Sequence, residues 1–205
     1  MINEEMLYKL RERVSSMMSE YRYNHTVGVE KMALYLARHC LPEKTMEVSA
    51  AALLHDITKE LSYQSQLELV KKAKLDLDED TLSTPSVLHS LTAPYVVKCD
   101  FPDFATDEIL SAIEKHTLGD EEMSVLDKII FLADFIEDSR SYPDSLTTAK
   151  FVRNSMRKGY ISNNLSVLNR ACIMEFDSTL SHLARLGREV NKKTLLARDS
   201  LLSKM

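Results

Sequence analysis

Apolar positions recur along this chain at the three- to four-residue spacing of helices. Residues 3 to 20 show the pattern clearly, because charged side chains alternate with apolar ones that would share one helical face. The same periodicity predicts further helices over 25–40, 43–58, 62–75, 83–99, 106–116, 124–137, 146–159, 164–187 and 192–203. Only four Gly and five Pro interrupt the 205 residues, which favours an all-α fold.

A polar stretch over residues 138–145 is the clearest break in this pattern. We therefore expect a helical bundle formed by residues 1–143. We expect residues 144–205 to form a small helical extension packed on that bundle. A chain of this length can bury a substantial core.

Composition and charge narrow the classes of function. The formal net charge is −5, whereas a general nucleic-acid-binding surface would be basic. The longest apolar runs are about five residues, far below the roughly 20 that a membrane span needs, and no secretory signal is visible at the N-terminus. Three unpaired-looking cysteines suggest a reducing compartment. We expect a cytoplasmic protein that binds neither nucleic acid nor membrane.

The most unusual feature is a His-Asp pair, His55-Asp56, that ends the apolar run 50–54. A buried carboxylate needs a metal or a fixed partner to keep its charge. Residues i and i+1 of a helix point about 100° apart, so both side chains can converge on one ion. Lys59 would lie on the same side of the predicted helix. The alternative is a hydrogen-bonded pair at a helix end, and the dipeptide alone does not decide between the two.

Further candidate ligands stand at comparable places, each near a helix end beside small or apolar residues. They are His25, His89, His116 and Asp134. A set of His and Asp ligands without thiolate suits Fe, Mn, Zn or Co and an open, catalytic site better than a structural zinc site. His39 and His182 are expected to be structural or helix-end histidines.

The order His25, His55-Asp56, Asp134 resembles the HD-domain superfamily of metal-dependent phosphohydrolases. The segments 22–29, 52–59, 88–89, 112–117 and 126–137 are similar to the YqeK-type family of bacterial symmetrical diadenosine tetraphosphate hydrolases, and 194–199 is a weaker counterpart of a C-terminal family motif. The chain departs from the family pattern at Ser90, Leu118, Asp138 and Asp199. None of these departures removes a candidate ligand.

The resemblance implies an HD-type helical bundle and assigns a role to each of these residues. Metal would be bound by His25, His55, Asp56 and Asp134. His89 and His116 would either complete a second metal site, bridged by Asp56, or hold substrate phosphate beside a single ion. Catalysis would rest on Asp56, Lys59 and Asp134. The expected substrate-binding residues are Arg22, Lys59, His89, His116, Thr117, Arg140, Thr194 and Arg198.

The implied reaction is the attack of metal-activated water on a phosphoanhydride, cutting diadenosine tetraphosphate into two ADP. One or two divalent ions are expected, with iron favoured over manganese, cobalt or zinc. The expected partner is a dinucleoside polyphosphate or an ADP-like nucleotide, and a homodimer is compatible with the sequence. Two alternatives stay open: another HD-type nucleotide phosphohydrolase, and a nucleotide-sensing module without turnover.

Overall fold

The structure, a computed structural model, describes residues 1–82 and 84–205, and these contain helices but no β-strand. The all-α expectation is confirmed. The α-helices are α1 (Glu4–Ser15), α2 (Glu20–Cys40), α3 (Thr45–Leu54), α4 (Tyr63–Ala73), α5 (Glu79–Leu82), α6 (Pro85–Asp100), α7 (Asp107–Lys115), α8 (Val125–Ile136), α9 (Pro143–Ser155), α10 (Ile161–Arg185) and α11 (Lys192–Ser203). Short 3₁₀ helices occupy Pro42–Lys44 and Pro102–Phe104.

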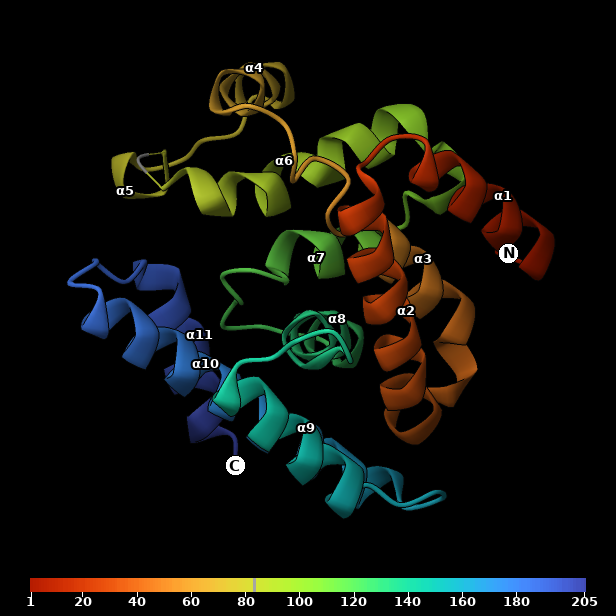
Figure 1. Cartoon of the computed structure of the whole chain (residues 1–205), viewed down its shortest axis with the longest axis vertical. Helices are drawn as coiled ribbons and strands as arrows, with labels where there is room; N and C mark the ends of the chain where they lie inside the picture. Colours follow the sequence, from red (N-terminus) through yellow and green to blue (C-terminus); the bar gives the residue numbers. More distant parts are fainter. Residues whose placement is uncertain (83) are drawn as a thin grey trace.

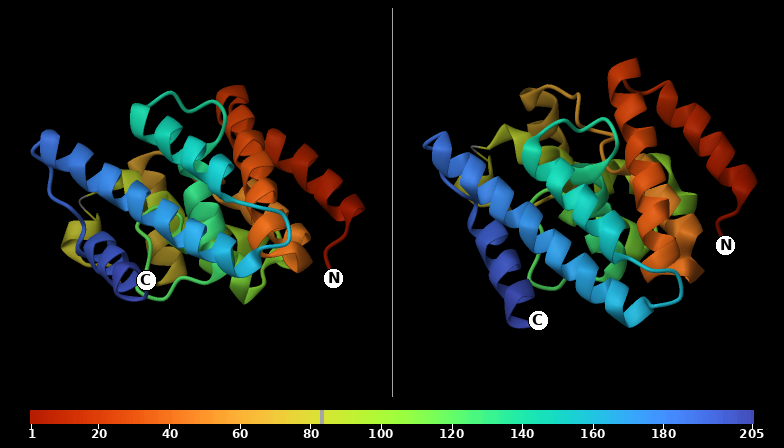
Figure 2. Two further views of the ribbon diagram at one scale, coloured as in Figure 1. Left: turned by 90° about the horizontal axis from the view of Figure 1, so that it is seen from below. Right: turned by 60° about the horizontal axis from the view of Figure 1, so that its bottom comes forward.

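Helix α8 lies at the centre of the molecule, with α2, α3 and α7 on one side and α9 and α10 on the other (Figure 1). Its sequence is apolar on nearly every face, as a helix surrounded by other helices requires. Phe131 of α8 packs against Phe176 of α10, with ring centroids 4.5 Å apart. The chain ends, α1 and α11, lie on opposite sides of the molecule (Figure 2).

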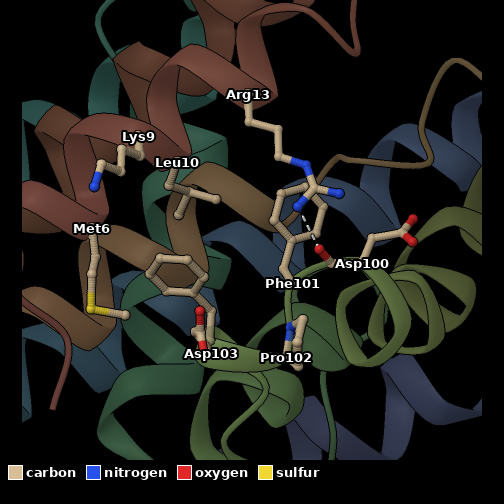
Figure 3. Close-up of a pocket in the computed structure, with 9 residues that line it drawn as sticks. Met6, Lys9, Leu10, Arg13, Asp100, Phe101, Pro102 and Asp103 are labelled. Atoms are coloured by element: carbon tan, nitrogen blue, oxygen red, sulfur yellow. Dashed lines mark hydrogen bonds between the residues drawn. The ribbon is translucent and has the colours of Figure 1, made fainter.

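Helix α1 is held to the bundle by two arginines. The guanidinium of Arg13 lies 4.2 Å from the centroid of the Phe101 ring and donates to the Asp100 carbonyl at 2.6 Å (Figure 3). Arg11 donates from Nε to Glu30 of α2 at 3.1 Å. These contacts tie α1 to α2 and to the loop after α6, so the first helix is an integral part of the bundle.

Several helix starts follow the capping chemistry of the sequence. Ser62, Thr106 and Ser124 each accept a hydrogen bond from a backbone N–H of the first turn, as N-cap residues do. Ser19 caps α2 in the same way, so this helix begins at Glu20 instead of near residue 25 as predicted. Ser83, expected to open the predicted helix over 83–99, lies outside the described residues.

The prediction of a helix over 43–58 is wrong at its end. Helix α3 stops at Leu54, and the chain continues through residues 55–60 in tight turns closed by i+3 to i bonds, such as Lys59 N–H to the Asp56 carbonyl at 2.9 Å. The His-Asp pair therefore follows the helix. Helix α9 also begins earlier than predicted, because Pro143 suits a first turn.

The C-terminal helices pack against the rest of the bundle. Helix α10 contacts α2, α8 and α9, and α11 contacts α10. The division at residue 143 stays a prediction. None of the helices in the described part of the chain combines the length and the apolar character that a membrane span requires.

Gly119 couples the end of α7 to the C-terminal helices. It has φ +71°, a conformation that glycine adopts without steric cost. A Cβ atom there would lie 2.6 Å from Phe176 Cζ and 3.0 Å from Ala197 Cβ. The glycine thus allows the chain after α7 to pass directly over α10 and α11.

We expect Gly119→Ala to lower the free energy of unfolding by about 2–4 kcal/mol, because left-handed strain adds to overpacking. Gly187→Ala is the matched control, since Gly187 also has positive φ but has open space around it. It should cost only about 1–2 kcal/mol. Urea unfolding of both variants measures the difference, and equal losses would contradict a packing role for Gly119.

Candidate metal centre

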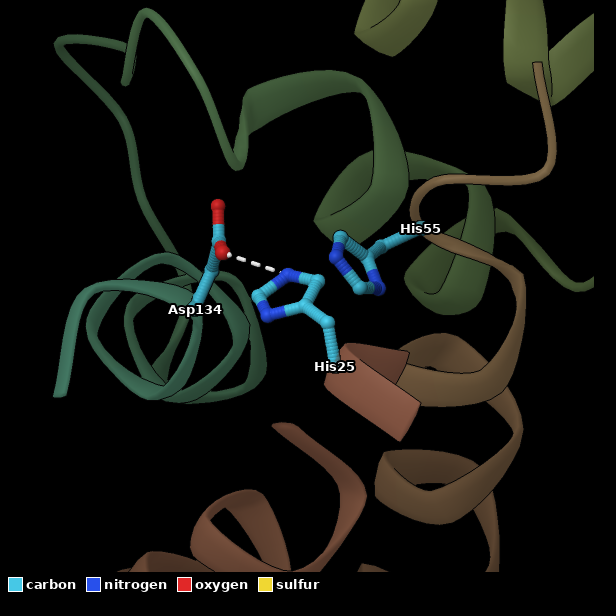
Figure 4. A group of neighbouring side chains, drawn as sticks. All are labelled: His25, His55 and Asp134. Atoms are coloured by element: carbon cyan, nitrogen blue, oxygen red, sulfur yellow. Dashed lines mark ion pairs between the residues drawn. The ribbon is translucent and has the colours of Figure 1, made fainter. Parts of the chain in front are cut away.

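The six candidate ligands come from five separate parts of the chain and meet at one point. His25 lies on α2, the His55-Asp56 pair in the turns after α3, and His89 on α6. The other two are His116, which ends α7, and Asp134 on α8. His25, His55 and Asp134 are seen converging in Figure 4.

Asp56 stands in the middle of this cluster, with each carboxylate oxygen facing a different pair of histidines. Its Oδ2 atom lies 3.4 Å from His55 Nε2 and 3.8 Å from His25 Nε2. Its Oδ1 atom lies 3.2 Å from His89 Nε2 and 3.6 Å from His116 Nε2. The carboxylate therefore separates a His25/His55 half of the site from a His89/His116 half.

Backbone carbonyls orient two of the imidazoles. His55 Nδ1 lies 2.7 Å from the Ala52 carbonyl, and His116 Nδ1 lies 2.7 Å from the Ile113 carbonyl. A carbonyl can only accept, so Nδ1 carries the proton and donates it. The Nε2 lone pair is then directed into the site, which is the tautomer that a metal ligand needs.

Buried polar atoms without hydrogen-bond partners show that the residues present fit a metal ion. Among the described residues, His25 Nε2, His55 Nε2 and Asp56 Oδ1 are such atoms, and each would cost free energy if nothing bound it. Donor atoms of His25, His55 and Asp134 lie within 4.8 Å of one another, as do those of His55, Asp56 and His116. Imidazole and carboxylate donors without sulphur suit a divalent transition metal.

Two arginines border the carboxylates. Arg22 donates to Asp56 Oδ2 at 2.7 Å. Arg140 forms an ion pair with the Asp134 carboxylate and donates from Nε to the Asp134 carbonyl at 2.8 Å. The Asp134 side chain keeps 24% of its surface exposed, whereas that of Asp56 keeps 1%. The site therefore opens to solvent beside Asp134 and Arg140.

Both carboxylates are held in the ionised form. Burial would raise the pKa of Asp56, but the neighbouring His55 and His116 more than reverse this and hold the pKa well below its ordinary value. Burial likewise opposes ionisation of Asp134, and His25 overcomes it, so that its pKa is also lowered. The centre thus presents negative charge that a cation can neutralise.

Lys59 and His89 lie together beside the Asp56 carboxylate. The Lys59 ammonium lies 3.2 Å from His89 Nε2. Burial lowers the pKa of Lys59, although the Asp56 charge partly opposes this. Burial also lowers the pKa of His89 to about 4, so its imidazole is neutral at pH 7 and one of its two nitrogens can accept a hydrogen bond or bind metal.

The remaining predicted substrate contacts divide into two groups. Thr117 Oγ1 lies 3.2 Å from His89 Nε2, and the buried Thr194 lines the same cavity as Thr117. Arg198, by contrast, pairs with Asp177 at 2.6 Å and with Asp199 at 2.9 Å on the surface of α11. Thr117 therefore lies at the metal centre, whereas the described contacts of Arg198 are with surface carboxylates.

Sequence reasoning missed Glu137, the carboxylate that orients His25. Its Oε1 atom lies 3.2 Å from His25 Nδ1, and it accepts from the Ser139 N–H at 2.8 Å through Oε2. A Cβ atom on Gly28 would lie 2.5 Å from Glu137 Oε2, so glycine leaves the room that this side chain needs. The signal was available, because Glu137, like Asp134, ends a buried apolar run.

A buried network, also missed, fixes the turns that carry the His-Asp pair. Thr58 Oγ1 donates to the His89 carbonyl at 2.9 Å, and Gln66 donates to the Thr58 carbonyl at 2.6 Å. Thr92 Oγ1 donates to Gln66 Oε1 at 2.5 Å. These bonds join the segment after α3 to α4 and α6, which sets the distance between Asp56 and His89.

Fold and site together define a helical protein with a buried His-Asp centre built for a divalent metal. The family model of the HD domain matches residues 22–137, which include all six candidate ligands. The chain belongs to the HD-domain family.

The chain is similar over nearly its whole length to proteins named symmetrical bis(5'-nucleosyl)-tetraphosphatase. It is 29% identical to the one from Halalkalibacterium halodurans, covering 95% of this chain and 96% of that protein. It is also 29% identical to the one from Bacillus subtilis, covering 93% and 94%. A crystal structure titled as a predicted HD superfamily hydrolase involved in NAD metabolism, from Clostridium acetobutylicum, has a TM-score of 0.83 at 28% identity and covers 96% of this chain and 97% of that one.

We expect Glu137→Gln to weaken metal binding about 10- to 100-fold, because the ligand His25 would lose the carboxylate that orients it. Asp138→Asn is the matched control, since Asp138 lies next in the chain but is exposed and paired with Arg153. Metal affinity measured by competition with a chelator gives the answer. Unchanged affinity in the Glu137 variant would contradict the orienting role.

Proposed function

We propose that this protein hydrolyses diadenosine tetraphosphate symmetrically to two ADP, using a divalent metal. The observation that carries the proposal is the position of Asp56, a buried carboxylate with a different histidine pair at each oxygen. The similarity to symmetrical tetraphosphatases over nearly all of both chains supports the choice of substrate.

In this proposal His25, His55, Asp56 and Asp134 hold the metal. When bound, a divalent ion would lower the pKa of bound water towards neutrality and polarise a phosphoryl oxygen. The nitrogen and oxygen donors suit iron, manganese, cobalt or zinc, and of these we propose iron.

His89 and His116 complete the site on the other side of Asp56. They bind either a second ion or an oxygen of the substrate phosphate. Their Nε2 atoms lie 3.0 Å apart and both face Asp56 Oδ1, which lacks a hydrogen-bond partner among the described residues. If a second ion binds, His89 and His116 would hold it together with Asp56.

Cations at the rim neutralise the polyphosphate. Arg22, Lys59 and Arg140 lie beside the carboxylates and supply positive charge where charge grows in the transition state. Water adds to one of the two central phosphorus atoms, the bond from that phosphorus to the bridging oxygen breaks, and the bridging oxygen leaves with the second ADP. The net charge of −5 is compatible with this, because only the site must be positive.

We also propose a role for each part of the chain and a cellular location. The residues of the HD bundle carry the chemistry, and residues 144–205 pack against it and contribute to the lining of two cavities. Three free cysteines, two of them buried, support a cytoplasmic location.

We expect Asp56→Ala to lower the rate of ADP release from diadenosine tetraphosphate by at least about a hundredfold, more than the loss of a residue that only orients a ligand would cost. Chelation of the metal should abolish the activity of the parent protein, and adding iron or manganese should restore it. Asp76→Ala, which removes an exposed carboxylate, serves as the control.

Chromatography of the nucleotides, together with metal analysis, distinguishes the outcomes. Parental activity in Asp56→Ala would contradict the mechanism. If the metal-loaded protein instead left diadenosine tetraphosphate intact and cut another nucleotide, that result would contradict the proposed substrate. It would identify a different HD-type nucleotide phosphohydrolase.

We expect Lys59→Met to lower kcat about 10²- to 10³-fold, the effect of removing one donor to developing charge. The bound metal should be retained, since Lys59 is not a ligand. Lys71→Met, on the exposed face of α4, is the matched control. Steady-state kinetics with metal analysis tests this, and loss of metal from Lys59→Met would show that the lysine acts on the structure of the centre instead.

A further inference from the structure

Two cavities flank the C-terminal half of α10, and the same two residues, Thr179 and Leu183, line both. The first, the polar cavity, has a volume of about 730 Å³, and its lining includes Val87, Thr117 and Thr194. The second, the aromatic cavity, has a volume of about 440 Å³; its lining includes Phe135, Tyr142, Ser178, His182 and Arg185. Both volumes fall in the range of about 300–1,000 Å³ that is typical of ligand sites.

Each cavity adjoins a different half of the metal centre. The polar cavity reaches it through Thr117, whose hydroxyl lies 3.2 Å from His89 Nε2. No candidate ligand lines the aromatic cavity, and Arg140 links the cavity to Asp134. Phe135 directly follows that residue, and Arg140, which pairs with Asp134, donates to the Tyr142 hydroxyl at 3.2 Å.

The chemistry of the aromatic cavity suits a nucleobase. Three of its lining side chains carry flat π systems, those of Phe135, Tyr142 and His182, and Arg185 adds a guanidinium plane. Purines stack on such surfaces. Tyr142 keeps 53% of its surface exposed although its hydroxyl is held by Arg140, so its ring is fixed at one edge and remains open to a stacking partner.

The polar cavity offers a different lining. None of the described residues that line it carries an aromatic ring, and hydroxyl, amide and charged side chains stand there beside apolar ones such as Val87 and Leu183. A symmetrical cut leaves equal halves of the dinucleotide on either side of the scissile bond. An enzyme that makes such a cut needs room for a nucleoside on both sides of its metal. One cavity is linked to the centre through Thr117 and His89, and the other through Tyr142, Arg140 and Asp134.

We propose that the aromatic cavity binds one adenine of the dinucleotide by stacking between Tyr142 and His182, while the opposite nucleoside enters the polar cavity. This inference rests on the proposed function and adds a second nucleoside subsite to it. It also assigns a binding role to His182, which sequence reasoning treated as structural.

The chain contains no tryptophan, so a single introduced tryptophan reports on the cavity without background. His182→Trp places it in the aromatic cavity, away from the Arg140–Tyr142 contact. Tyr160→Trp is the control, because Tyr160 is 67% exposed at the opposite end of α10. The ligand is a diadenosine tetraphosphate whose central bridging oxygen is replaced by methylene, which prevents turnover.

We expect the analogue to quench the emission of His182→Trp and to leave that of Tyr160→Trp unchanged. Inorganic tripolyphosphate, which has no base to stack, should leave both unchanged. Adding Tyr142→Leu to the reporter should weaken binding of the analogue about five- to tenfold, as loss of one stacking surface does. The same change at Tyr160 should have no effect.

Binding of the analogue by calorimetry with no change in the emission of His182→Trp would overturn the inference. Equal quenching by tripolyphosphate would do the same, because the signal would then report phosphate alone. The proposed function is tested separately by ADP release from the unaltered protein. A protein that releases ADP but shows no quenching would keep its function and lose this subsite.

Discussion

The buried charge of Asp56 is the constraint on which the rest of this structure depends. A carboxylate removed from water loses hydration that only nearby positive charge, donors or a metal can replace. Four imidazoles and Arg22 surround it, contributed by α2, the turns after α3, α6 and the end of α7. These elements must therefore converge at one point. The packing of the bundle around α8 brings them together there.

Helix α8 shows how an apolar core can position polar groups. A capping box of Ser124 and Asp127 fixes its first residue, and its buried apolar side chains fix its rotation and depth. Its last turn then places Asp134 beside the candidate ligand His25, and Glu137 follows directly to orient His25. A shift of one residue along this helix would move both carboxylates away. The dense packing that surrounds it resists such a shift.

Helix content could be predicted, and candidate ligands could be chosen, because both leave local signals. Apolar periodicity and cap residues act over three or four positions, and Ser62, Thr106 and Ser124 cap the helices expected of them. The predicted helix ends were less accurate where two sequence signals disagreed. At Leu54 the apolar pattern continued, but the chain changed to tight turns held by Thr58 to α6. Lys59 reaches His89 through those turns, and the helical spacing that first suggested its position does not apply.

Sequence reasoning was sufficient for the all-α fold, for the candidate ligands and, through family resemblance, for the expected chemistry. It could not show which oxygen of Asp56 faces which histidine pair, that Glu137 orients His25, or that two cavities share a wall on α10. These features depend on contacts between residues up to 112 positions apart. Such contacts are decided by which helices pack together in three dimensions. Apolar periodicity shows the buried face of a helix, but it does not show which other helix that face contacts.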